Sequence, residues 1–331
     1  MEDRLYSSIT ELVGHTPLLE LKGFEKEHGL PARILAKLEY FEPSGSVKDR
    51  AAFAMIDAAE KEGKIHKGDV ILDFTSGNTG IALAAYCNAL GYRFAAVLQP
   101  GVSKERTQIL KAYGSIFLEF QDIPGVMEMI RTEGLNFGKF YEFLQKYADE
   151  HGYFFINQGT NRANVQAHYN GTGPEIWTAT KGHVDYFTAL AGTGGTIAGC
   201  GKYLKEKNPD LKVIGAQPAP GSRKDSAHPE RDTIDGVTAF EGVDEDAVPH
   251  FFEEFQIHCD EVLDLDADEA YQTGRDLVRS DGIFLGQSAA AAVLAAEKIA
   301  RRPEAAGKTI VCVCADNAFK YLSTGIYRED A

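Results

Sequence analysis

The sequence predicts an α/β fold in which parallel sheets are covered by helices, and three observations support this prediction. Short apolar runs of strand length alternate with longer stretches in which small apolar residues recur at helical spacing. Glycine-rich turns follow several of the apolar runs and open the next helical stretch. The 331 residues are 44% hydrophobic and 25% charged, which is typical of a globular chain of about two domains.

Strand and helix candidates follow one another along most of the chain. The predicted strands cover residues 33–38, 70–74, 94–98, 186–190, 212–217 and 309–314. The predicted helices cover residues 46–62, 81–90, 103–113, 196–206, 267–280 and 289–301. Residues 121–147 predict one or two extra helices, and the polar, turn-rich residues 218–240 predict a loop. Two α/β blocks of similar size therefore flank a boundary near residue 160.

Charge and cysteine content exclude several classes of partner and of fold. The 34 Lys and Arg against 49 Asp and Glu give a net charge of −15, which disfavours nucleic acid and anionic membranes as partners. No apolar run approaches the roughly 18 residues of a membrane span, and no signal-peptide pattern opens the chain, so we expect a cytoplasmic protein. The odd count of five cysteines disfavours a disulfide scaffold. Cys312 and Cys314 lie in an apolar run and predict buried strand thiols, with no metal expected.

Four motifs stand at the junctions between predicted strands and helices, where open parallel sheets bind ligands. The segment Gly192-Thr193-Gly194-Gly195-Thr196 indicates a phosphate site, because glycines allow close approach and a helix N-terminus offers free N–H groups. It lacks the Lys-Ser/Thr pair of a Walker motif, and Ile197 stands where a dinucleotide fingerprint requires glycine. An ordinary structural turn is the alternative interpretation.

The other three motifs bring hydroxyls, amides and one amine to helix starts. Thr75-Ser76-Gly77-Asn78-Thr79-Gly80 offers neutral, directional donors that suit a carboxylate, although a plain N-cap is the alternative. Lys48 lies in the first turn of a predicted helix, where a cation is unfavourable, so we expect a lowered pKa and a nucleophilic amine. Ser288 follows a glycine turn before an alanine-rich helix and by default would be an N-cap.

The combination of motifs resembles a known family. EPSGSVKDR, TSGNTG, HYNGTGPEIW, GTGGTIAG and the Ser288 turn occur in the order seen in fold-type II enzymes that use pyridoxal 5′-phosphate, specifically the cysteine synthase/cystathionine β-synthase group. The resemblance implies two open twisted sheets flanked by helices, as in the tryptophan synthase β-subunit. It also implies a large cofactor-binding domain of residues 1–47 and 160–331, a smaller mobile substrate-binding domain of residues 48–159, and a homodimer.

The resemblance carries roles to individual residues of this chain. Lys48 is similar to the lysine that forms the internal aldimine, Asn78 to the residue that bonds the phenolic oxygen of the cofactor, and Ser288 to the partner of the pyridine nitrogen. Cofactor phosphate is expected on Gly192, Thr193, Gly194, Gly195 and Thr196. The substrate carboxylate is expected on Thr75, Ser76, Asn78, Thr79 and Gln158. Because a serine hydroxyl does not hold a proton on the ring nitrogen, the ring should favour β-elimination or β-replacement over transamination.

Several positions depart from the family pattern. Gly159 stands where cysteine synthases usually carry an aromatic residue, which predicts a wider or looser site. Asp232 and Asp235 place carboxylates in a loop whose usual residues are neutral or basic, and Gly236 of this loop is expected near the substrate. Such a carboxylate could act as a base on water or a thiol and would repel HS⁻, whereas a solvated loop carboxylate is the alternative. Residues 121–147 are longer than in compact relatives and predict a lid or a dimer contact.

These features leave more than one reaction open. The resemblance implies a β-replacement that passes through an aminoacrylate intermediate, with Lys48 as the base at Cα. Asp232, Asp235 and Gly159 favour an enzyme that uses L-cysteine, releases sulfide and forms serine or lanthionine. Synthesis of cysteine from O-acetylserine or O-phosphoserine and sulfide is the main alternative. A diaminopropionate-type synthase and a non-catalytic relative are further alternatives, and intact Lys48 and Asn78 disfavour the last.

Overall fold

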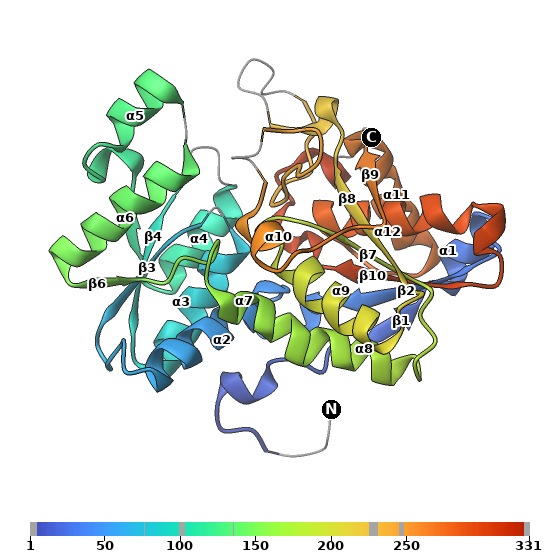
Figure 1. Ribbon diagram of the computed structural model, residues 1–331, viewed down its shortest axis with the longest axis horizontal. Coiled ribbons are helices and arrows are strands. Elements are labelled where there is room, and N and C mark those ends of the chain that lie inside the picture. The colour runs from blue at the N-terminus through green and yellow to red at the C-terminus, as the bar shows by residue number, and fades with distance from the viewer. Residues whose placement is uncertain are drawn as a thin grey trace.

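The computed structural model describes residues 5–75, 77–98, 103–134, 136–224, 231–244 and 248–327. Its elements form two sheets that lie side by side, each covered by helices (Figure 1). The strands are β1 (Leu18–Glu20), β2 (Arg33–Leu38), β3 (Val70–Phe74), β4 (Arg93–Val97), β5 (Ile116–Leu118), β6 (Tyr153–Phe155), β7 (Tyr186–Leu190), β8 (Lys212–Pro218), β9 (Glu261–Leu265) and β10 (Thr309–Cys314). The helices are α1 (Lys22–Glu27), α2 (Lys48–Lys61), α3 (Asn78–Leu90), α4 (Lys104–Ala112), α5 (Val126–Glu133), α6 (Phe137–His151), α7 (Arg162–Ala167), α8 (Gly173–Ala179), α9 (Gly195–Lys207), α10 (His250–Glu254), α11 (Ala267–Ser280) and α12 (Gln287–Ala300).

The larger sheet has six strands in the order β1-β2-β10-β7-β8-β9, and all neighbours are parallel except β1 and β2. Strand β10 is buried on both faces, as expected for a central strand of a covered parallel sheet. Its Ile310, Cys312 and Cys314 pack with α12 on one side, whereas Val311 and Val313 pack with α9 on the other. The prediction of buried strand thiols at Cys312 and Cys314 is therefore confirmed.

The smaller sheet has four parallel strands in the order β5-β4-β3-β6. Ile71 of β3 packs with α2 and α3, while Val70 and Leu72 pack with α5 and α6 on the opposite face. Residues 121–147 thus supply two helices that cover one face of this sheet, as Figure 1 shows. All four strands of the smaller sheet lie within residues 70–155, between strands β2 and β7 of the larger sheet in the chain.

The predicted elements agree closely with the observed ones in the sheet centres. Strands β2, β3, β7 and β10 have the predicted bounds, and β4 begins one residue earlier. No helix or strand forms between residues 231 and 240, in line with the predicted loop. Within the described residues, no helix is both long and apolar enough to cross a membrane. The division into a fixed and a mobile domain stays a prediction.

Candidate active site

A cavity of about 740 Å³ opens where strands of both sheets end. Thr75, Gln158, Gly192 and Ala315 each follow a strand and line it, as the rule for open parallel sheets predicts. Ser76 lies outside the described residues, and Asp232 is not part of the wall. The other predicted site residues all line the cavity: Lys48, Thr75, Asn78, Thr79, Gln158, Gly192, Thr193, Gly194, Gly195, Thr196, Asp235, Gly236 and Ser288.

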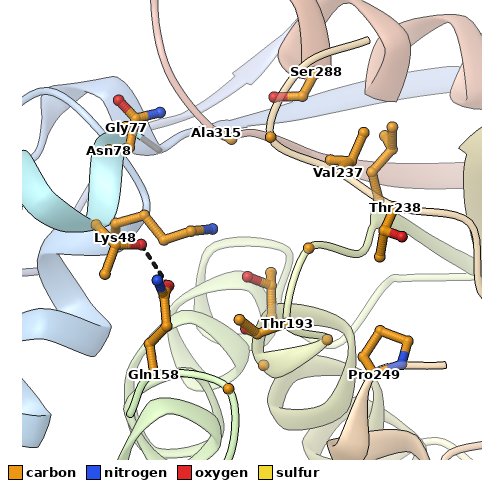
Figure 2. Close-up of a pocket in the computed structure, with 18 of the residues that line it drawn as sticks. Lys48, Gly77, Asn78, Gln158, Thr193, Val237, Thr238, Pro249, Ser288 and Ala315 are labelled. Atoms are coloured by element: carbon orange, nitrogen blue, oxygen red, sulfur yellow. Dashed lines mark hydrogen bonds between the residues drawn. The ribbon is translucent and has the colours of Figure 1, made fainter. Parts of the chain in front are cut away.

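Lys48 is the first residue of α2, and its side chain extends into the cavity. Figure 2 shows it reaching toward a space that Gln158 and Ser288 approach from opposite sides. Desolvation lowers the pKa of the Lys48 amine, and the negative charge of Asp316 opposes that shift in part. A buried amine with a lowered pKa has a larger neutral fraction, so Lys48 is suited to act as a nucleophile and a base.

The loop before α3 is held together by its own side chains. The Thr75 hydroxyl oxygen accepts hydrogen bonds from the N–H groups of Gly77 at 3.4 Å and Gly80 at 2.9 Å. The Thr79 hydroxyl donates to the Gln158 side-chain oxygen at 2.7 Å. The N-cap of α3 is Gly77, so Thr75 is not a plain N-cap, although its hydroxyl oxygen accepts from two N–H groups near the helix start. The loop presents several neutral hydroxyl and amide groups to the cavity.

The loop before α9 is built from backbone and close packing. Gly194 is the N-cap with φ of +88°, which favours glycine. A Cβ on Gly195 would lie 2.3 Å from the Asn164 side-chain oxygen, so no larger residue fits there. The Asn164 amide donates to the Thr193 hydroxyl at 3.1 Å and fixes the loop from the outside. The N–H groups at the start of this 13-residue helix have no acceptor within the helix, so they are suited to bind an anion.

Asn78 connects the two sheets through a buried polar network. Its side-chain N–H donates to Asp316 at 2.6 Å, and its side-chain oxygen accepts from the Lys320 amine at 2.9 Å. The Tyr321 hydroxyl also donates to Asp316 at 2.5 Å. Asp316 and Lys320 follow β10, whereas Asn78 opens α3 beside the other sheet. Asp316 and Lys320 belong to none of the sequence motifs, although both follow the carboxyl end of a central strand.

The two loop carboxylates separate in space. Asp235 lines the cavity, 2.9 Å from the Lys224 amine and 3.6 Å from the Arg106 guanidinium. Its backbone N–H donates to the Gln287 side-chain oxygen at 3.1 Å, so Gln287 fixes the position of this loop. Asp232 instead packs against Gly325. A Cβ on Gly325 would lie 2.4 Å from the Oδ1 atom of Asp232. Of the two, only Asp235 is placed to meet a substrate.

Gly159 does not leave an opening in the wall. A Cβ at this position would lie 2.9 Å from the Tyr141 hydroxyl and 3.4 Å from the Tyr141 ring. Tyr141 belongs to α6, and Phe137 and Gly138 of the same helix also line the cavity. The prediction that Gly159 widens the site at this point is therefore wrong, because Tyr141 occupies the space. Residues 121–147 contribute part of the cavity wall.

The residues present fit pyridoxal 5′-phosphate. The loop Gly192–Thr196 offers a phosphate the N–H groups at the start of α9, and its glycines are packed so closely that a Cβ on Gly195 would lie 2.3 Å from Asn164. Lys48 supplies an amine for a carbonyl group. The Ser288 hydroxyl lines the cavity from the second residue of α12 and is not the N-cap, which is Gly286. It is thus free to meet a ring nitrogen.

Comparisons with known proteins agree with this geometry. The family model described as "Pyridoxal-phosphate dependent enzyme" matches residues 9–316. A cysteine synthase of Aquifex aeolicus is 38% identical over 329 residues, covering 97% of this chain and 92% of that protein. The crystal structure of an O-ureido-L-serine synthase has a TM-score of 0.81 at 32% identity, covering 99% of this chain and 98% of that one.

A second solved structure is similar over the whole chain. It is that of a hydrogen sulfide-producing enzyme from Fusobacterium nucleatum, with a TM-score of 0.79 at 32% identity, covering 96% of this chain and all of that one. The matches extend across both sheets and include every motif that lines the cavity. The chain therefore belongs to the fold-type II pyridoxal phosphate-dependent enzymes of the cysteine synthase/cystathionine β-synthase family and catalyses β-replacement in cysteine metabolism.

Proposed function

We propose that this enzyme acts on L-cysteine, releases sulfide and forms serine with water or lanthionine with a second cysteine thiol. The observation that carries the proposal is the Asp235 carboxylate in the cavity wall. The Gln287 side chain accepts a hydrogen bond from the Asp235 backbone N–H, and Lys224 and Arg106 form ion pairs with the carboxylate, so the position of Asp235 is fixed. A carboxylate fixed at the cavity wall is suited to take a proton from an attacking O–H or S–H group.

The residues of the chain divide the work between two ends of the substrate. Thr75, Thr79 and Gln158 bind the α-carboxylate, and the Lys48 amine removes the proton from Cα and later returns one. When bound, pyridoxal phosphate supplies an electron-withdrawing group that stabilises negative charge at Cα. The Cβ–S bond then breaks, and the sulfur leaves as HS⁻. The nucleophile forms the new bond at Cβ and gives its proton to Asp235.

The cations beside Asp235 change one part of the expectation from sequence. Two positive charges within 4 Å compensate the carboxylate, so repulsion of HS⁻ by Asp235 is weakened. A role of Asp235 in excluding sulfide therefore loses support, whereas its position at the cavity wall still suits a base. The same compensation supports the second candidate, synthesis of cysteine from an activated serine and sulfide, which relatives named cysteine synthase also favour.

An incubation with L-cysteine tests the proposal. We expect sulfide release with matching amounts of serine or lanthionine, and Asp235→Asn should lower this turnover about 100-fold. The absence of sulfide from L-cysteine, together with cysteine formation from O-acetyl-L-serine and sulfide, would establish the second candidate. Turnover that depends on ammonia would indicate a diaminopropionate-type synthase. No turnover with any of these substrates would indicate a non-catalytic relative.

We also expect a homodimer in the cytoplasm, as the family resemblance implies. Light scattering should give twice the 36.2 kDa mass of the chain. We further expect the part formed by residues 48–159 to move toward the rest when a substrate carboxylate binds, which would exclude water from the cavity. Small-angle scattering with and without O-acetyl-L-serine should show the closed form as a smaller radius of gyration.

A further inference from the structure

Tyr141 and Gly159 share one space in the cavity wall, although 18 residues separate them in the sequence. The Tyr141 hydroxyl lies 2.9 Å from the position of a Cβ on Gly159, and real Cβ atoms do not approach a neighbour this closely. A side chain at residue 159 and the tyrosine at residue 141 therefore exclude one another. The aromatic ring in this space is that of Tyr141 on helix α6, and the loop after β6 has a glycine there.

The ring of Tyr141 is held firmly in this position. Its centroid lies 6.2 Å from the rings of Phe137 and Phe140 and 6.0 Å from that of Phe155. These distances are typical of interacting aromatic pairs in a packed core. Because the ring cannot turn away freely, its hydroxyl stays at the cavity wall beside Gly159.

The Tyr141 hydroxyl is available as a hydrogen-bond donor. It makes no hydrogen bond within the part of the chain that the structure describes, although its helix lines the cavity. Burial and the nearby charge of Asp73 raise the pKa of Tyr141 to about 12, so the phenol keeps its proton at neutral pH. The hydroxyl is thus a neutral donor facing the cavity.

The neighbouring amide of Gln158 is already engaged. Its side-chain N–H donates to the Phe74 carbonyl oxygen at 2.9 Å, and its side-chain oxygen accepts from Thr79. Gly159 follows Gln158 directly, so the Tyr141 hydroxyl stands next to the group expected to bind the substrate carboxylate. It offers a second donor beside the remaining N–H of the Gln158 amide.

We propose that Tyr141 is a substrate-binding residue whose hydroxyl donates a hydrogen bond to the bound amino acid and whose ring sets the width of the cavity at Gly159. This inference deepens the proposed function, since it names a contact made by the same site. It applies to any amino-acid substrate of the β-replacement, whichever nucleophile follows.

The first test removes the hydroxyl alone. Tyr141→Phe in the holoenzyme should raise KM for the amino acid about tenfold, with kcat changed less than twofold. Tyr147→Phe makes the same change on the same helix at a buried ring outside the cavity wall, and should leave KM within twofold. An unchanged KM in Tyr141→Phe, or an equal rise in Tyr147→Phe, would overturn the proposal.

The second test uses the exclusion between the two positions. Gly159→Ala should lower kcat/KM about tenfold when Tyr141 is present, because the new methyl group displaces the hydroxyl. In a protein that already carries Tyr141→Ala, Gly159→Ala should cause no further fall in kcat/KM. Equal losses in both backgrounds would contradict the shared space.

The substrates are chosen to separate this proposal from the wider one. L-cysteine and O-acetyl-L-serine are both used, and the one that the unaltered enzyme turns over serves for the KM comparison. If neither reacts, the proposed function has failed, and titration of the cofactor absorbance with L-alanine still measures amino-acid binding. A dissociation constant that rises about tenfold in Tyr141→Phe then supports the hydroxyl contact, and an unchanged one overturns it.

Discussion

The cavity is bounded by two glycine-rich loops that look alike in sequence and differ in construction. Both connect a parallel strand to the start of a helix, at Thr75–Gly80 and at Gly192–Thr196. In the first, side chains hold the loop, as in the bond from Thr79 to Gln158. In the second, the backbone and a packed glycine hold it, as at Gly195 against Asn164.

The first loop must give up a hydrogen bond within the protein before it binds a ligand, whereas the second loop already has N–H groups available. The hydroxyl of Thr79 is already bonded within the protein, so a substrate carboxylate has to compete with Gln158 for it. The N–H groups at the start of α9 have no such competitor in the helix, because the first N–H groups of any helix lack an internal acceptor. We therefore expect the 192–196 loop to determine cofactor affinity and the 75–80 loop to determine substrate affinity.

Removal of the cavity amine that lies between the two expected binding loops should have the largest effect. Lys48→Ala should lower turnover by roughly 10³-fold or more and abolish the visible absorbance band of the bound cofactor. Lys61→Ala, at the exposed end of the same helix, is the matched control and should change neither. Turnover that persists in Lys48→Ala would mean that the reaction does not take place at the Lys48 amine.

A methyl group in the backbone loop should act on the cofactor. Gly195→Ala places a Cβ 2.3 Å from the Asn164 oxygen, so we expect cofactor affinity to fall at least about tenfold. Absorbance titration of the apoenzyme with pyridoxal phosphate measures it. Gly221→Ala adds the same methyl group where no atom lies within 4 Å, and should have no effect. Equal losses in the two variants would mean that the close packing at Gly195 is irrelevant.

A hydroxyl removed from the side-chain loop should act on the substrate. Thr79→Val should raise KM for the amino acid about tenfold and leave cofactor affinity unchanged, since the lost donor faces the carboxylate site. Thr132→Val, at an exposed position on α5, is the control for loss of a helical threonine hydroxyl. If Thr79→Val releases cofactor with no change in KM, the two loops do not divide their tasks.

The last prediction concerns the stability of the fold beneath the side-chain loop. Burial raises the pKa of Asp73 to about 8, against an ordinary value of 3.8, and its Oδ2 has no hydrogen-bond partner among the described residues. Because the unfolded chain loses this proton first, the folded state loses relative stability as pH rises from about 4 to 8. The free energy of unfolding of Asp73→Asn, relative to that of the unaltered protein, should therefore increase by about 1–3 kcal/mol as pH rises from 5.5 to 8.

Urea unfolding near those two pH values measures this difference. Asp149→Asn, a change from carboxyl to amide on the exposed side of α6, is the matched control. A stability gain that is equal at both pH values, or that shrinks as pH rises, would show that Asp73 is ionised in the folded protein.

The central strands could be predicted from the sequence, and the edge strands could not. Strands β2, β3, β7 and β10 lie inside the sheets, where burial on both faces demands continuous apolar runs. The four strands that were missed, β1, β5, β6 and β9, are the edges of the two sheets. Three of them have only three residues, and an edge strand is buried less completely, so its pattern is weak.

The site shows the same contrast between local and distant signals. Lys48, Ser288 and the two loops could be found because each lies in a short motif at a strand or helix end. Tyr141 could not, because it reaches the cavity from the middle of a helix whose sequence shows only an amphipathic pattern. Arg106 escaped notice for a similar reason, since it reaches Asp235 from helix α4, which is far from Asp235 in the chain. Lys224 lies in the same predicted loop as Asp235, where the sequence gives no sign that the two side chains pair.

The buried network around Asn78 has a consequence for how the molecule unfolds. Asn78 begins α3 beside the smaller sheet, whereas Asp316 and Lys320 follow β10 of the larger one. Opening either half would leave charged groups in the interior without partners, which is costly. The two halves should therefore melt in one cooperative transition, and calorimetry should find a single unit where the topology has two sheets.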